Sequence, residues 1–193
     1  MTLADPMVHR FTREQYRQMA EAGHFDNARV ELLDGEILDL PAQGEPHVYV
    51  VSELNRWLTA QLPQGKYQVR CQAPLAAGPA SDPEPDFAVV PAIREDMSAT
   101  PDTAIFVIEV ADSSLARDRR KATSFAAAGV GEYWIINLRS RVIEQHTLPR
   151  QAMEDPQEPA RYAVVRTFTT KEMISCTVLP LGTRPVTEFL APF

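Results

Sequence analysis

The sequence predicts a single α/β domain in which a mixed β-sheet is flanked by helices. Residues 104–138 show strand, helix and strand patterns in that order, which is typical of a βαβ unit with parallel strands. Earlier in the chain, Asp34 and Gly35 stand between two strand-like runs in RVELLDGEILDLP, which indicates a hairpin of antiparallel strands. At 193 residues the chain is long enough for one domain, so we expect a single domain over 1–193 with its core at about 10–190.

Capping residues and apolar spacing predict three helices. Thr12 caps the first and Gly23 follows its end, Pro46 stands near the first position of the second, and Gly129 closes the third. The expected helices span 11–23, 45–63 and 117–130.

Apolar runs bounded by turn residues predict the strands outside the hairpin. The expected strands are 66–75, 85–90, 104–111, 132–138, 141–148 and 162–170, with a short closing segment in 174–182. Residues 149–160 are polar and contain proline, so we expect an exposed loop there.

Composition narrows the function classes. A net charge of −7 argues against a protein that coats nucleic acid by bulk electrostatics, although a local basic patch beside an acidic site remains possible for an enzyme. No apolar run approaches the roughly 20 residues that a membrane span needs, so no membrane association and a cytoplasmic location are expected. Cys71 and Cys176 show no CxxC spacing, and both are expected to be buried thiols.

Two acids interrupt or precede apolar strands. Glu109 shares one strand face with Ile105 and Val107, where an ionised carboxylate is costly unless a cation or metal compensates it. Asp86 opens the apolar run FAVV and is expected at a sheet edge near a loop. Two such carboxylates at neighbouring strand ends suit a hard divalent cation; alternatively, each acid caps a loop or pairs with an arginine.

Six further residues are candidates for the chemistry. Lys121 follows Asp118 by three residues on the predicted third helix, so it can point toward the strand that holds Glu109, or else form a surface ion pair. Glu31 lies in the hairpin, where a solvent-facing glutamate is the commoner case. His47 falls on the inward stripe of the second helix, as a core histidine, a substrate contact or a proton carrier. The basic residues beside Asp118 are Arg117, Arg119 and Arg120.

Taken together, these segments resemble the Uma-two family of restriction endonucleases, within the PD-(D/E)XK nuclease superfamily. The matching segments are VELLDGEI, PxH at a helix start, EPDFAVV, FVIEVADSSLARDRRK and AAAGVGEYWIIN. The resemblance covers about residues 10–190 and implies a restriction-endonuclease-like fold, a mixed central sheet between helices.

The resemblance also implies roles for individual residues. Asp86 and Glu109 match the two acidic motif positions, as ligands of Mg²⁺ or Mn²⁺. Glu31 matches a further acid of the site, and His47 matches the histidine at the head of the helix. A strict motif would place lysine at position 111, where this chain has Ala111, so Lys121 on the next helix is the expected substitute.

The sequence therefore favours a metal-dependent endonuclease that acts on nucleic acid, most simply DNA. Asp86 and Glu109 are expected to bind the metal, Lys121 and Glu31 to complete the catalytic set, and His47 to contact substrate. Phosphate contacts are expected from Arg117, Arg119 and Arg120. A non-catalytic, dimeric binding or scaffold protein is the alternative, and a hydrolase of small phosphoesters is a third reading. Two-fold symmetric cutting would make the enzyme a homodimer.

Overall fold

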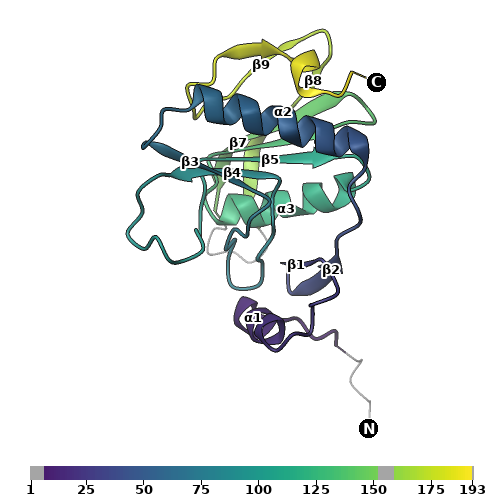
Figure 1. The fold of residues 1–193 in the computed structure, drawn as a ribbon, viewed down its shortest axis with the longest axis vertical. Helices are drawn as coiled ribbons and strands as arrows, with labels where there is room; N and C mark the ends of the chain where they lie inside the picture. Colours follow the sequence, from purple (N-terminus) through teal and green to yellow (C-terminus); the bar gives the residue numbers. More distant parts are fainter. Residues whose placement is uncertain (1–6, 152–158, 193) are drawn as a thin grey trace.

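The computed structural model describes residues 7–151 and 159–192, which form one mixed α/β domain (Figure 1). Its centre is a six-stranded sheet in the order β3-β4-β5-β6-β7-β8. The strands are β3 (Tyr67–Cys71), β4 (Phe87–Pro91), β5 (Phe106–Ala111), β6 (Glu132–Asn137), β7 (Val142–Arg150) and β8 (Arg161–Thr169). Only β5 and β6 pair in parallel, because helix α3 (Leu115–Ala127) connects them, and the other neighbours are antiparallel.

Two helices cover opposite faces of this sheet. On one face, α2 (Glu45–Gln61) packs Val50, Leu54 and Leu58 onto a core that includes Ile108 of β5. On the other face, α3 packs Phe125 and Ala126 onto a second core that includes Val107 of β5 and Ile135 of β6. Alternation along β5 therefore directs Val107 and Glu109 toward α3.

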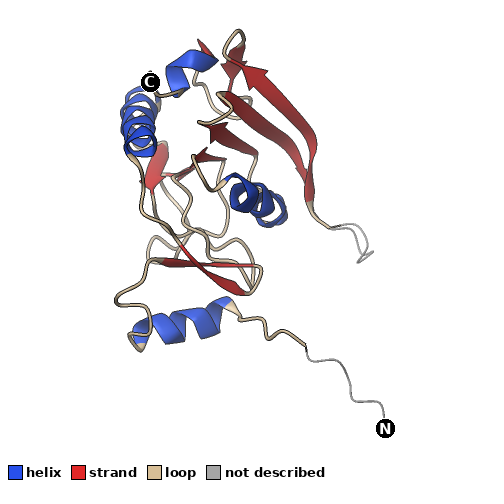
Figure 2. Ribbon diagram, turned by 90° about the vertical axis from the view of Figure 1, so that its right-hand side faces the viewer, coloured by secondary structure: helices blue, strands red, loops and turns tan. Residues whose placement is uncertain are grey.

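A separate hairpin lies beside the sheet, next to α1 (Arg13–Glu21), as Figures 1 and 2 show. The hairpin pairs β1 (Val30–Leu33) with β2 (Glu36–Asp39) around Asp34 and Gly35. Both turn residues have positive φ, 52° and 77°, as a two-residue hairpin turn requires. Leu32 bridges to Asp82 in the loop before β4, which brings the hairpin to the end of the central sheet.

The C-terminal segment closes the face that α2 covers. It contains β9 (Met173–Ser175), β10 (Thr183–Pro185) and the short 3-10 helix η1 (Val186–Phe189). β9 and β10 form a second two-stranded sheet. Phe189 contacts Trp57 of α2 and Trp134 of β6 edge to face, so this segment belongs to the same core as α2.

The predicted fold class is confirmed, as are the hairpin and the three helices. Two details differ: β3 ends at Cys71, and β7 continues through Arg150. The rest of the predicted 149–160 loop lies largely outside the described residues. Cys176 is buried as expected, but the expectation was wrong for Cys71, which is exposed because it lies on an edge strand. Within the described ranges, no helix has the length and apolar character needed to cross a membrane.

Candidate active site

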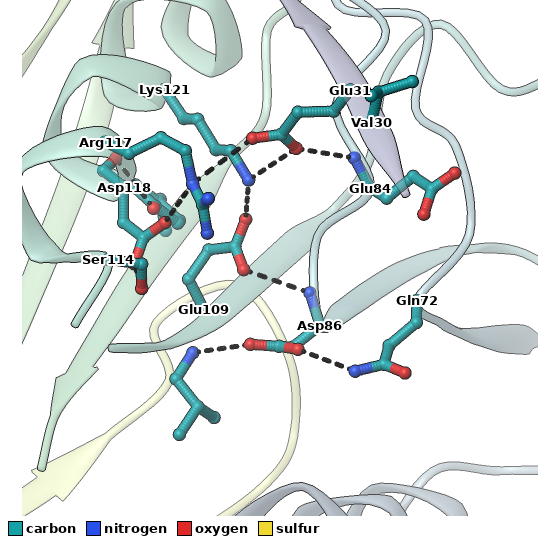
Figure 3. Close-up of polar contacts among 12 residues, drawn as sticks. Val30, Glu31, Gln72, Glu84, Asp86, Glu109, Ser114, Arg117, Asp118 and Lys121 are labelled. Atoms are coloured by element: carbon teal, nitrogen blue, oxygen red, sulfur yellow. Dashed lines mark hydrogen bonds and ion pairs between the residues drawn. The ribbon is translucent and has the colours of Figure 1, made fainter. Parts of the chain in front are cut away.

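An ion-paired trio from three separate elements forms the centre of the site (Figure 3). Lys121 Nζ lies 2.8 Å from Glu109 Oε1 and 2.9 Å from Glu31 Oε2. Glu109 comes from β5, Lys121 from the face of α3 that packs on the sheet, and Glu31 from β1 of the hairpin. All three are buried, with Glu31 fully inaccessible. The trio therefore forms only when sheet, helix and hairpin have assembled.

Asp86, just before β4, is held by donors on both carboxylate oxygens. Its Oδ2 accepts from the Val110 amide at 2.8 Å and lies 3.1 Å from His47 Nε2, while its Oδ1 accepts from Gln72 Nε2 at 3.1 Å. The Asp86 amide donates to Glu109 Oε2 at 3.2 Å, so the two acids are tied together. Burial disfavours the charged form of Asp86, but these hydrogen bonds outweigh it and lower its pKa.

Lys121 is one ammonium group among several buried carboxylates. Burial raises the pKa of Glu109 well above its ordinary value, and the attraction of Lys121 offsets only part of this. Burial opposes the charge on Lys121, yet Glu109, Glu31 and Asp118 together raise the lysine pKa, so it stays cationic. One ammonium thus faces several buried carboxylates, and the site has an excess of negative charge that a further cation would stabilise.

Asp118 lies on the same buried face of α3 as Lys121, as the spacing of three predicted. Ser114 donates to its Oδ2, and Arg117 Nε lies 3.8 Å from its Oδ1. Burial raises the pKa of Asp118, although Lys121 acts in the opposite direction. Asp118 and Lys121 are thus both buried, not at the surface, and the side chain of Asp118 contacts Ser114 and Arg117.

His47 is placed by the first turn of α2, directly after Pro46. The Asp86 carboxylate can only accept, so His47 Nε2 is the donor of this hydrogen bond. His47 Nδ1 is buried and has no hydrogen-bond partner among the described residues. The histidine therefore supports Asp86 directly, which the inward stripe alone did not specify.

These side chains open onto a pocket of about 70 Å³ between the β2–α2 connection and the start of α3. It is lined by Glu31, His47, Glu84, Asp86, Glu109, Val110, Ser114, Arg117 and Lys121, by Arg29, and by residues 40–44 and 112–113. Arg117 Nε lies 3.4 Å from Glu31 Oε1, and Arg29 is exposed at the rim. The pocket thus combines carboxylates at its base with two arginines.

The other two arginines of the basic cluster lie elsewhere. Arg119 pairs with Glu144 of β7, its Nε 3.0 Å from Oε2. Arg120 pairs with Glu36 at 2.8 Å, on the outside of the hairpin. Successive helical residues point in different directions, so the structure brings only Arg117 of this cluster to the pocket.

The chemistry of Asp86 and Glu109 fits a divalent cation of the magnesium type. Within residues 7–151 and 159–192, no group of three or more His, Cys, Asp or Glu side chains is arranged to hold a metal. Mg²⁺, however, commonly uses one or two carboxylates and keeps several waters. A pocket of about 70 Å³ accommodates several waters, since each needs only about 10–15 Å³.

The sequence had missed two residues of this region, Gln72 and Arg29. Gln72 follows Cys71, which pairs with Phe87, so the register of β3 and β4 places it opposite Asp86. That register was the one available signal for Gln72. No pattern in the sequence singled out Arg29, which precedes β1.

Comparison with known protein families identifies the family of this chain. The chain matches the family model Uma2, described as "Putative restriction endonuclease", over residues 13–186. The chain belongs to the Uma2 family. Membership of this family indicates a nuclease, in agreement with the resemblance drawn from the sequence segments. No curated protein matches the chain in sequence.

A solved structure shares the fold of this Uma2 protein. It is the crystal structure of "a putative nuclease belonging to DUF820" from Anabaena variabilis ATCC 29413. The TM-score is 0.72 at 12% sequence identity, over 93% of this chain and 97% of the other. At that identity the similarity shows the fold alone, and it extends over nearly the full length of both chains.

Proposed function

We propose that this Uma2 protein is a metal-dependent endonuclease of the PD-(D/E)XK type that hydrolyses phosphodiester bonds in DNA. The observation that carries the proposal is the pocket base: Asp86 and Glu109 are joined by a hydrogen bond and both line the pocket. Lys121 lies 2.8 Å from Glu109. Lys121 on α3 thus contacts Glu109, in place of a lysine at position 111.

Asp86 and Glu109 would hold Mg²⁺ or Mn²⁺, which would supply Lewis acidity toward water and the phosphate. Lys121 remains charged, and from its place beside Glu109 it would orient the attacking water and stabilise negative charge on the phosphate. Glu31 holds Lys121 from the other side and thereby fixes the direction of the ammonium. His47 acts through Asp86.

Phosphates of the DNA backbone would meet the arginines at the pocket. Arg117 and Arg29 both line it, and a guanidinium binds phosphate oxygens through paired donors. Arg119 and Arg120 are neutralised by Glu144 and Glu36, so they would contact DNA only at a distance from the pocket.

Two alternative functions are a non-catalytic scaffold and a hydrolase of small phosphoesters. The net charge of −7 favours a non-catalytic scaffold, but such a protein would lock Asp86 and Glu109 in arginine pairs. Asp86 and Glu109 instead contact a histidine, an amide and a lysine. The same net charge favours a small phosphoester over duplex DNA as substrate.

The deciding experiment compares cleavage of supercoiled plasmid, single-stranded DNA and a small aryl phosphodiester, each with Mg²⁺, with Mn²⁺ and with EDTA. We expect metal-dependent nicking by the wild type and its loss in Asp86→Asn and Glu109→Gln. Glu14→Gln, an exposed acid on α1, is the matched control and should cleave normally. Hydrolysis of the aryl diester alone would favour the small-phosphoester enzyme, and no hydrolysis of any substrate by folded protein would favour the scaffold.

We also propose a homodimer, because two copies related by a two-fold axis would cut both strands of a duplex. Light scattering should then give twice the mass of the 21.6 kDa chain. A monomeric mass that persists in the presence of duplex DNA would exclude paired cutting.

A further inference from the structure

Gln72 contacts Asp86 through both its backbone and its side chain. β3 ends one residue earlier, at Cys71, and its register with Phe87 leaves Gln72 opposite Asp86. The Gln72 amide donates to the Asp86 carbonyl at 3.1 Å, and its side-chain Nε2 donates to Asp86 Oδ1 at 3.1 Å (Figure 3). One residue thus fixes the main chain and the carboxylate of Asp86 together.

The backbone of Gln72 adopts a conformation that glycine favours. Its φ is +47°, in the left-handed region that residues with a side chain rarely occupy. Such conformations persist where the surrounding contacts hold them, and they concentrate at functional sites. A glycine here would relieve the strain but would leave Asp86 Oδ1 without the side-chain amide.

The distribution of donors shows what this amide does. Val110 and His47 both contact Asp86 Oδ2, so they restrain the carboxylate from one side. Gln72 is the donor described for the other oxygen, Oδ1, and so restrains the plane of the carboxylate from the second side. Gln72 does not line the pocket, so it acts through Asp86 rather than by touching a substrate.

We propose that Gln72 is a positioning residue that orients the Asp86 carboxylate toward a divalent cation in the pocket. This inference rests on the proposed metal site of Asp86 and Glu109 and goes beyond it by assigning a role to a residue outside the family motifs. Hydrogen-bond partners of ligating groups fix ligand orientation, and their removal weakens metal binding by about 10–100-fold.

The test measures Mn²⁺ affinity of the full chain by calorimetry, alongside thermal unfolding without metal. Gln72→Gly removes the amide and the strain, whereas Gln72→Met removes the amide and keeps both the length and the strain. We expect both variants to bind Mn²⁺ about 10-fold more weakly, although Gln72→Gly should unfold at a higher temperature than Gln72→Met.

The matched control is Leu148→Gly, because Leu148 also has positive φ, +58°, and is exposed in β7 away from the pocket. It should leave Mn²⁺ affinity unchanged. Wild-type affinity in either Gln72 variant, or affinity that follows unfolding temperature instead of the loss of the amide, would overturn the positioning role alone. A wild-type protein that binds no Mn²⁺ would overturn the proposed metal site, and the positioning role with it.

Discussion

Two buried glutamates on adjacent parallel strands have opposite environments. Glu109 of β5 faces α3 and lines the pocket, with Lys121 as its cationic partner. Glu132, at the start of β6, is fully buried on the face that packs against the C-terminal segment. Its carboxylate accepts from the Trp134 indole, the Gln145 amide, and both the backbone and the hydroxyl of Thr177.

This difference in environment indicates that Glu132 stabilises the fold, whereas Glu109 is suited to ligand binding. Glu132 is surrounded by neutral donors that satisfy both of its oxygens, and it ties β6 to β7 and to the segment after β9. Glu109 has one cation shared with Glu31 and an open pocket beside it. A buried carboxylate whose hydrogen bonds are complete has little use for a metal, whereas one in a surplus of negative charge binds a cation readily.

Removal of one hydrogen-bond partner from each glutamate should produce the largest difference between them, measured as the free energy of unfolding. Lys121→Met leaves Glu109 and Glu31 buried without their shared cation, so we expect it to lower the free energy of unfolding by about 3–5 kcal/mol. Gln145→Met removes one of several neutral donors to Glu132 and should lower it by about 1–3 kcal/mol. Urea unfolding at pH 7 without divalent metal measures both, and equal losses would contradict the distinction.

Neutralising each acid should separate the two glutamates by their effect on activity. We expect Glu109→Gln to reduce cleavage by at least about 100-fold, since a ligand matters no less than its hydrogen-bond partners. Its stability should also fall, by about 2 kcal/mol, because the new amide NH₂ must face either the Lys121 ammonium or the Asp86 amide, which only donate.

Glu132→Gln should lower stability and leave activity largely intact. The new amide NH₂ would face groups that only donate, such as the Trp134 indole, so the unfolding free energy should fall by about 2 kcal/mol. Plasmid nicking per folded molecule should stay within a few-fold of wild type. A loss of nicking as large as that of Glu109→Gln would place Glu132 in the function after all.

Local patterns predicted much of the fold and part of the site. Strand periodicity identified the apolar strand that carries Glu109, and a spacing of three placed Asp118 and Lys121 on one face of α3, where both are buried. Asp34 and Gly35 predicted the hairpin turn. Each of these signals depends on residues close together in the chain.

The remaining features depend on contacts between distant segments. Glu31 looked like a solvent-facing residue, because nothing near it in sequence shows that α3 and the loop before β4 cover the hairpin. Glu132 attracted no attention, since its partner Thr177 lies 45 residues away. The neutralisation of Arg119 by Glu144 is equally invisible without the pairing of α3 with β7.

The rate at which the two cysteines are labelled tests whether Glu132 holds the C-terminal segment closed. Burial, with a contribution from the nearby Glu132, raises the pKa of Cys176 to about 12. Partial burial, with a contribution from Asp86, raises the pKa of Cys71 as well, but this thiol is exposed to a reagent. Because the thiolate is the reactive form, a disulfide reagent at pH 8 should label Cys71 quickly and Cys176 only when the C-terminal segment opens. Glu132→Gln weakens that closure by about 2 kcal/mol, so labelling of Cys176 should accelerate roughly 30-fold, while Glu109→Gln should leave it unchanged. Rapid labelling of both thiols in the wild type would mean that Glu132 does not hold the segment closed.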